Sequence, residues 1–262
     1  MLAPLLERPR DTAILTDFDG TLSPIAARPE LARPLGGAAE LLDRLAGRFA
    51  VVAVVSGRPV SFLVEHLALP GSMRASVPPP VRFVGLYGIE WADGNGGTTI
   101  EPSALAWRPV LAEVLARLER AAPSGALVES KGLAVTVHWR GAPEAEPWAV
   151  ASVAAEVART GLESHPGRCS VELRPPLPID KGSVTRSLVE RCSAAVYLGD
   201  DVGDLPAFAA LDALREESGL SAVKVAVADE ESAPEVLDAA DLVLGSADEV
   251  LDVLEWLASS GT

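Results

Sequence analysis

This sequence has little cysteine and no long hydrophobic run. Its 262 residues include only two cysteines, Cys169 and Cys192, which are too few for a disulfide framework and match neither metal-binding nor redox spacing. No uninterrupted apolar stretch reaches the length of a membrane-spanning helix, and the N-terminal residues lack the charged and apolar regions of a signal peptide. We therefore expect a soluble cytoplasmic protein that does not contact a membrane.

Positive charge is also scarce. The chain has 22 Lys and Arg against 37 Asp and Glu, a formal net charge of −15, which disfavours nucleic acid or an anionic membrane as a partner. An anionic small molecule would need local cations instead. We expect a monomer whose partner is a small molecule.

The order of apolar segments predicts an α/β fold with two domains. At 262 residues the chain exceeds the usual size of a single core, and 48% of its residues are hydrophobic. Strand-like runs alternate with helical stretches, which is typical of a doubly wound parallel-sheet, Rossmann-like core. We expect this core to span 1–88 and 178–262, interrupted by a smaller α/β cap domain over 89–177. The strand-like runs lie near 13–17, 50–55, 81–86, 195–199, 223–228 and 241–244.

Two carboxylates follow the first of these runs. Side chains alternate along a strand, so Asp17 and Asp19 can leave its end on the same side. Two neighbouring acids would repel an anionic substrate unless a cation such as Mg2+ lies between them and the phosphate. Asp17 could then attack phosphorus, while Asp19 could act as general acid and base. The alternative is an ordinary pair of solvated turn residues.

Two further segments have phosphate-binding chemistry. The Ser56 hydroxyl and the turn at Gly57 and Arg58 follow an apolar strand and could hold a phosphoryl oxygen, although such turns are often only structural. Asp180 has the position of a helix N-cap, which places Lys181 on the first helical turn. A cation at that end of the helix dipole needs a nearby anion. The alternative is a surface lysine.

Three acids lie within five residues at the end of a later strand: Asp200, Asp201 and Asp204. Such clustering is costly unless the carboxylates bind a hard cation or are well solvated. We expect Asp200 to ligate the metal directly. Asp201 and Asp204 would orient water or hold Lys181.

Together these four motifs resemble those of the haloacid dehalogenase-like phosphohydrolases, in the same order. The resemblance implies that Asp17 is the nucleophile and Asp19 the general acid/base, with Ser56 and Lys181 also catalytic. It also implies that Mg2+ is held by Asp17, by the main-chain carbonyl of Asp19 and by Asp200. We add Gly20, Thr21, Gly57 and Arg58 to the substrate-binding set.

Longer segments resemble the trehalose-6-phosphate phosphatase family within that superfamily. They are 17–25, 84–90, 131–140 and 172–176. The resemblance implies hydrolysis of trehalose 6-phosphate through an aspartyl-phosphate. Three positions depart from the family pattern: Tyr87 replaces a histidine, Gly203 a threonine and Leu205 a glutamate.

Charged residues in the expected cap are candidates for contacting sugar hydroxyls, because charged groups make the stronger hydrogen bonds to them. The family resemblance favours Glu90, Lys131 and Glu172. For each candidate, the alternative is an ordinary surface ion pair. The candidates are Glu90, Glu129, Lys131, Arg140 and Glu172.

Three alternative functions stay open. Another capped sugar-phosphate phosphatase, acting on sucrose phosphate or on glucosyl- or mannosyl-phosphoglycerate, would share the core motifs. A response-regulator receiver combines similar residues but is much shorter and has no cap. A non-catalytic sugar-phosphate sensor would not need the two aspartates at 17 and 19, which are both present.

Overall fold

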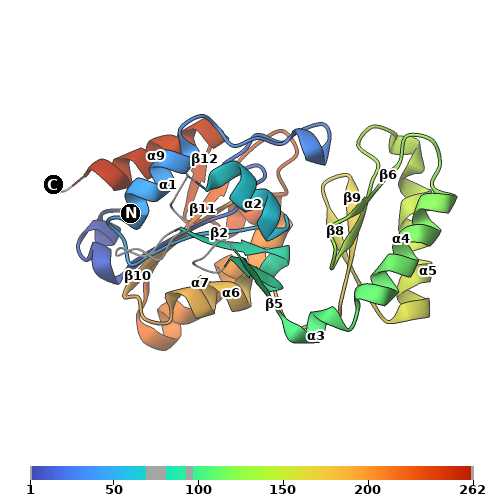
Figure 1. The fold of residues 1–262 in the computed structure, drawn as a ribbon. Helices are drawn as coiled ribbons and strands as arrows, with labels where there is room; N and C mark the ends of the chain where they lie inside the picture. The colour runs from blue at the N-terminus through green and yellow to red at the C-terminus, as the bar shows by residue number, and fades with distance from the viewer. Residues whose placement is uncertain (1, 69–80, 93–96, 261–262) are drawn as a thin grey trace. The chain divides into compact units, whose positions relative to one another are not determined.

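The structure is a computed structural model that describes residues 2–68, 81–92 and 97–260. Its chain divides into two compact units. The first unit comprises residues 1–26, 32–99 and 179–262, and the second comprises 27–31 and 100–178. Each unit has a sheet and a set of helices of its own (Figure 1).

The first unit is built on a sheet whose central strands are parallel. Six neighbouring strands run parallel to one another in the described residues. Two short strands extend one edge, where β4 pairs with β3 in antiparallel fashion. In spatial order the strands are β12 (Leu242–Leu244), β11 (Ser221–Val227), β10 (Ala194–Gly199), β1 (Thr12–Thr16), β2 (Val51–Val55), β3 (Arg82–Gly85), β4 (Glu90–Ala92) and β5 (Thr98–Ile100).

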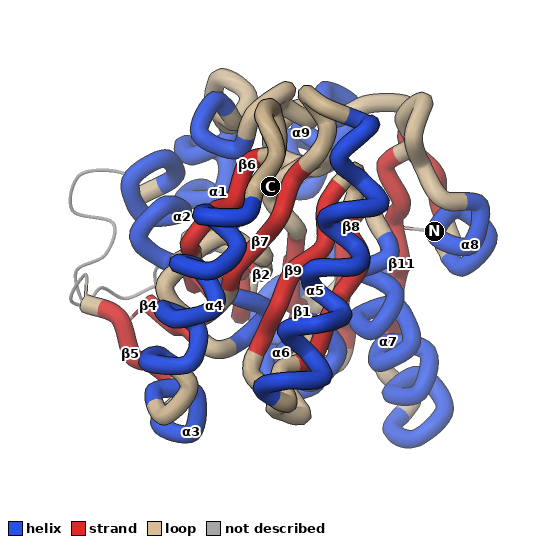
Figure 2. Tube along the Cα trace, turned by 90° about the vertical axis from the view of Figure 1, so that its right-hand side faces the viewer, coloured by secondary structure: helices blue, strands red, loops and turns tan. Residues whose placement is uncertain are grey.

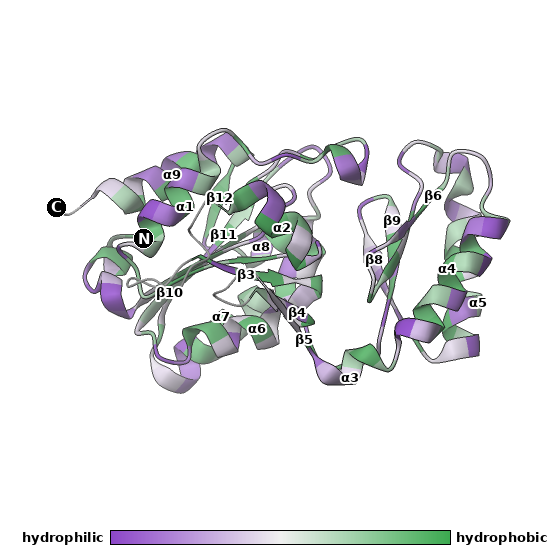
Figure 3. Ribbon diagram, viewed as in Figure 1, coloured by the Kyte–Doolittle hydropathy of each residue, from purple (hydrophilic) through white to green (hydrophobic). Residues whose placement is uncertain are grey.

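Helices cover both faces of this sheet, which explains why its central strands β1, β2 and β10 are buried throughout and largely apolar (Figure 3). One face packs against α1 (Ala38–Ala46), α2 (Val60–Leu67) and α9 (Ala247–Ser259). The other packs against α6 (Lys181–Val189), α7 (Leu205–Ser218) and α8 (Pro234–Ala239). Each helix presents an apolar stripe at helical spacing, such as Leu41, Leu42 and Leu45 on α1. The doubly wound α/β core expected from the sequence is thereby confirmed.

The second unit contains a separate antiparallel sheet. In spatial order it consists of β6 (Leu127–Ser130), β7 (Val135–His138), β9 (Ser170–Arg174) and β8 (Glu163–Gly167), which lie side by side in Figure 2. The helices α4 (Arg108–Ala121) and α5 (Glu146–Thr160) pack on one face of it, and α3 (Pro102–Leu105) precedes them. Because side chains alternate along a strand, the other face carries Glu129, Thr136, His138 and Glu172.

The boundary between the units differs from the expected one. Residues 89–99 belong to the first unit, because β4 and β5 extend its sheet beyond β3 instead of starting the cap. At the other end, Pro178 belongs to the second unit. The strand β8 was also not expected, since it contains a proline and a glycine, Pro166 and Gly167, which are rare inside strands.

Among the described helices, none combines the length and the apolar character that crossing a membrane would require.

Candidate active site

The four motifs of the first unit meet at one edge of its parallel sheet. Asp17 directly follows β1, Ser56 follows β2 and Asp200 follows β10. These strands are neighbours in the order β10, β1, β2, so their carboxyl ends are adjacent. This is the edge at which open parallel sheets bind their ligands.

Lys181 lies buried between two carboxylates. Its Nζ is 3.0 Å from Asp17 Oδ2 and 2.7 Å from Asp204 Oδ1. Asp180 caps α6 by accepting from the Ser183 N–H, and the Ser183 side chain completes a capping box, which fixes where the helix begins. Lys181 therefore occupies the first position of α6. The N-cap and the helix start expected from the sequence are both present.

Charge and burial have opposite effects on the pKa values of Lys181 and Asp17. Burial opposes the charge of Lys181, but the carboxylates of Asp17 and Asp204 outweigh it and raise the pKa of the ammonium well above its usual value. Burial also raises the pKa of Asp17 well above its usual value; Lys181 opposes this rise, and Asp204 adds to it. A bound divalent cation would favour the ionised form of Asp17, which is the form that a nucleophile needs.

Asp204 is held by four donors. Its Oδ1 accepts from Lys181 Nζ and from the Tyr197 hydroxyl at 2.8 Å, and its Oδ2 accepts from the backbone N–H groups of Asp200 and Asp201 at 3.0 and 3.3 Å. Burial raises the pKa of the Tyr197 hydroxyl well above its usual value, so this hydroxyl stays protonated and can donate a hydrogen bond. Asp204 thus orients Lys181 and the turn after β10.

The residues present fit a hard divalent cation. Carboxylate oxygens of Asp17, Asp200 and Asp204 lie within 4.8 Å of one another and are buried. Asp17 Oδ1 is buried and has no hydrogen-bond partner in the described part of the chain. Since both Asp204 oxygens already accept hydrogen bonds, Asp17 and Asp200 are the side chains that can ligate an ion. Buried carboxylate oxygens are the ligands that Mg2+ prefers.

A glycine makes this arrangement possible. Gly20 has a φ of +76°, and a Cβ at this position would lie 2.0 Å from Asp200 Oδ2. The backbone N–H groups of Gly20 and Thr21 donate to Ser23 O and Phe18 O within their own turn. Both N–H groups therefore have their acceptors within this turn. The Thr21 hydroxyl instead faces Asp200 Oδ1 at 3.5 Å.

The turn after β2 contains two hydrogen-bond donors that a ligand could use. The Gly57 N–H donates to no acceptor in the part of the chain that the structure describes. Ser56 Oγ accepts from the Arg58 N–H at 3.2 Å, which leaves the hydroxyl proton to donate elsewhere. Both groups can bind a phosphoryl oxygen.

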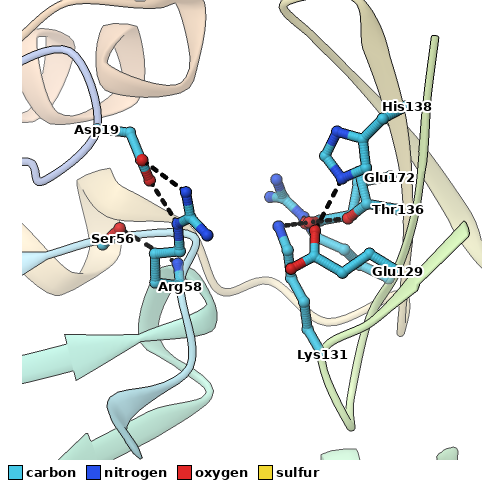
Figure 4. Close-up of polar contacts among 9 residues, drawn as sticks. Asp19, Ser56, Arg58, Glu129, Lys131, Thr136, His138 and Glu172 are labelled. Carbon is cyan, nitrogen blue, oxygen red and sulfur yellow. Dashed lines mark hydrogen bonds and ion pairs between the residues drawn. The ribbon is translucent and has the colours of Figure 1, made fainter. Parts of the chain in front are cut away.

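Arg58 is paired with Asp19. The Arg58 Nε and Nη2 atoms donate to the two carboxylate oxygens of Asp19, each at 2.7 Å (Figure 4). The sequence expectation had assigned Arg58 to substrate binding. In this structure its fork-shaped donor pair contacts the expected general acid/base.

Two departures from the family pattern lie close to the catalytic residues. The ring centroid of Tyr87 is 5.8 Å from Lys181 Nζ, and a Cβ on Gly57 would lie 2.5 Å from the Tyr87 hydroxyl. A Cβ on Gly203 would lie 3.7 Å from the same ring. Tyr87 therefore lines the site, with its backbone held at a φ of +60°. Leu205 is the first residue of α7, directly after Asp204.

Glu90 does not belong to the second unit. It lies on β4 of the first unit, and its Oε2 accepts from the Val60 N–H at 2.8 Å, near the start of α2. Its expected place in the cap is therefore wrong, because the chain extends the core sheet through this residue before it leaves for the second unit. In this structure Glu90 satisfies an otherwise unpaired N–H at a helix start.

The polar face of the second sheet centres on Glu172. The Glu172 Oε2 atom accepts from Lys131 Nζ at 2.5 Å and from the Thr136 hydroxyl at 2.8 Å (Figure 4). Its Oε1 accepts from Arg174 Nε. Burial would raise the pKa of Glu172, but Lys131 and Arg174 outweigh it and lower the pKa to about 2. The carboxylate is therefore ionised at neutral pH.

The remaining candidates lie on or beside the same face. Glu129 Oε2 is 2.7 Å from His138 Nε2, so these two side chains form a second polar pair (Figure 4). Arg140 follows β7 in the next turn and is half-buried. Glu129 and Glu172 thus lie on one sheet, and Lys131 directly follows its strand β6.

Four of these contacting residues were missed by sequence reasoning. Tyr197 and Thr136 lie within strands and read as core residues, and neither His138 nor Arg174 was among the candidates from the sequence. The alternation of Thr136, Val137 and His138 does place the two polar residues on one face. The contact of Tyr197 with Asp204 depends on the turn after β10, for which the sequence has no periodic signal.

Solved structures share this architecture. A structure described as a trehalose-6-phosphate phosphatase related protein superposes with a TM-score of 0.74 at 25% identity, covering 94% of this chain and 96% of that one. The C-terminal domain of Candida albicans trehalose-6-phosphate phosphatase also superposes at 0.74, with 21% identity, covering 97% of this chain and 96% of that one. Fold and site together define the haloacid dehalogenase-like fold with an inserted cap.

Sequence comparison narrows this class to one family. The family model described as trehalose-phosphatase matches residues 15–239. Trehalose-phosphate phosphatase of Mycobacterium avium (strain 104) is 37% identical over 215 residues, covering 77% of this chain and 52% of that relative. The chain belongs to the trehalose-phosphatase family. It spans about half the length of the curated relatives it matches.

Proposed function

We propose that this chain is a Mg2+-dependent phosphatase that hydrolyses trehalose 6-phosphate through an aspartyl-phosphate on Asp17. The observation that carries the proposal is the environment of the Asp17 carboxylate. One oxygen contacts Lys181 at 3.0 Å, and the other is buried without a hydrogen-bond partner among the described residues. An oxygen in this state is available to a cation or to an electrophile.

The chain's own residues account for both chemical steps. As a bond forms between an Asp17 oxygen and phosphorus, the bond from phosphorus to the sugar oxygen breaks, and Asp19 donates a proton to that oxygen. Asp19 then takes a proton from the water that attacks the aspartyl-phosphate, which releases phosphate and regenerates Asp17.

Other residues hold the phosphoryl group during these steps. Lys181 and the donors of Ser56 and Gly57 stabilise the negative charge of its oxygens. Asp17 and Asp200, with the Asp19 carbonyl implied by the resemblance, would hold Mg2+, whose charge neutralises phosphate and carboxylate repulsion when it is bound.

We further propose that the polar face of the second unit recognises the sugar. Glu129, Lys131 and Glu172 offer ionised donors and acceptors on or directly next to one sheet, and such groups bind neutral hydroxyls strongly. The relatives named trehalose-phosphate phosphatase support trehalose 6-phosphate as the substrate.

A panel of sugar phosphates tests the proposal. Phosphate release should be fastest with trehalose 6-phosphate, slower with sucrose 6-phosphate and glucosyl-3-phosphoglycerate, and slow with glucose 6-phosphate. Excess EDTA should stop the reaction and Mg2+ should restore it. Faster release from another disaccharide phosphate would replace the substrate but keep the chemistry, whereas full activity in EDTA would overturn the metal mechanism.

A further inference from the structure

Both oxygens of the Asp19 carboxylate are bound by one guanidinium. The Arg58 Nε donates to Oδ2 and Nη2 donates to Oδ1, each at 2.7 Å (Figure 4). Two parallel hydrogen bonds from a planar fork fix the direction of a carboxylate, which a single-point contact from lysine cannot do. The Asp19 side chain is 32% exposed, so Arg58, and not burial, sets its orientation.

Arg58 is itself held in place. Its side chain is only 10% exposed, and its guanidinium carbon lies 4.6 Å from the ring centroid of Phe62 on α2. Phe62 in turn meets the ring of Phe18 edge-to-face at 5.4 Å. Phe18 separates Asp17 from Asp19 in the sequence. The two aromatic rings that hold Arg58 are therefore connected to the segment that carries both aspartates. The guanidinium cannot simply follow a moving carboxylate.

We propose that Arg58 is the positioning residue of Asp19: its paired donors hold the carboxylate in the direction from which Asp19 serves the leaving-group oxygen. The inference rests on the proposed phosphatase function. When Asp19 gives its proton to the sugar oxygen as the ester bond breaks, one carboxylate oxygen faces that oxygen and the other stays on Arg58. Arg58 thus acts through Asp19 and not by binding the phosphate.

This role predicts a dependence on the leaving group. A sugar alkoxide leaves poorly without a proton, whereas p-nitrophenolate is a stable anion that leaves without one. Removing the Arg58 guanidinium should therefore slow the first chemical step with trehalose 6-phosphate. The rate of this step with p-nitrophenyl phosphate should not change. A phosphate-binding role would slow both.

The test uses Arg58→Gln and Arg58→Lys in single-turnover release of the leaving group, which excludes the later hydrolysis of the aspartyl-phosphate. We expect Arg58→Gln to release trehalose about 30-fold or more slowly, and p-nitrophenolate within about threefold of the wild-type rate. Arg58→Lys should fall between, because it keeps the charge but loses the second contact. Equal losses for the two substrates, or no loss for either, would overturn the proposal.

Arg117→Gln is the matched control. Arg117 makes the same two-point contact with Glu156 in the second unit, at 2.9 and 3.1 Å. Its loss should leave the ratio of the two rates at the wild-type value, so a changed ratio in this variant would also count against the proposal. A wild-type protein that releases no phosphate would instead overturn the proposed function itself.

Discussion

At the scale of single residues, the site depends on side chains that are costly to bury. Lys181, Asp17 and Asp204 are each at most 5% exposed, and ionised groups are kept this far from water only when they are paired. Asp204 has four donors and Lys181 has two carboxylates, whereas Asp17 has one oxygen without a partner in the described residues. The Asp17 oxygen without a hydrogen-bond partner is therefore the atom to which we assign contact with the cation or with the electrophile.

Asp17→Asn should abolish activity and leave the fold intact. The amide keeps the shape of the carboxylate but lacks its nucleophilic charge, so kcat should fall on the order of a thousandfold or more. Because burial raises the pKa of Asp17 above its unfolded value, its ionised form is destabilising at neutral pH, and Tm should be unchanged or higher. Phosphate release and thermal unfolding measure the two effects. Activity within tenfold of wild type would assign the nucleophile elsewhere.

At the scale of helices and strands, apolar periodicity predicted the core well. The central parallel strands β1, β2 and β10 are buried on both faces and read as largely apolar runs, and Asp180 marked the start of α6 by its capping chemistry. The short strands at or next to a sheet edge were harder to predict. Glu90 and Trp91 on β4 do not form an apolar run, and Pro166 lies inside β8, so neither strand has the apolar pattern of the core strands.

Pairing across strands also decides the charge state of Glu172. Its folded pKa of about 2 lies below the usual value of 4.5, since Lys131 and Arg174 outweigh burial. A depressed carboxyl pKa contributes stability above pH 4.5, and that contribution is lost as the pH falls toward 2. Between pH 4.5 and about 2, the contribution of Glu172 to the free energy of unfolding falls by about 3 kcal/mol.

Lys131→Met should therefore raise the pKa of Glu172 and weaken the pH dependence of stability. We expect the substitution to cost about 1–3 kcal/mol at pH 7 and less at pH 3, where Glu172 carries less charge in the variant. Carboxyl NMR titration and chemical unfolding at the two pH values are the measurements. Lys224→Met, which removes an ion pair with Asp212 in the first unit, should leave the Glu172 titration unchanged. An unaltered Glu172 pKa in Lys131→Met would contradict this account.

At the scale of the whole molecule, the two units divide the work. The first unit contains every residue assigned to phosphoryl transfer, and the second contains the polar sheet face assigned to the sugar. Because the formal charge is −15, an anionic ligand needs a local cation, and Lys181 is the one beside Asp17. The family motifs could be recognised in the sequence because they follow strands. The membership of Glu90 in the first unit could not, because it depends on where the chain leaves the core sheet.

This division predicts that the second unit affects substrates according to their size. Binding energy from a remote sugar ring can be used to align the reacting groups, so a truncated substrate loses turnover as well as affinity. Lys131→Ala and Glu129→Gln should lower kcat/KM for trehalose 6-phosphate by about 10- to 100-fold, the range for a lost hydrogen bond to a charged group. Both variants should hydrolyse p-nitrophenyl phosphate within about twofold of wild type, since that substrate has no sugar to be recognised.

The matched control is Glu113→Gln on α4, on the helical side of the second sheet, where the side chain is 69% exposed and lies 3.5 Å from Arg117. It should change neither rate. The measured quantity is the ratio of the two kcat/KM values, which partial unfolding cannot mimic because an unfolded fraction lowers both equally. Losses of the same size on both substrates in Lys131→Ala would show that the polar face supports the fold, and the sugar would then have to be recognised elsewhere.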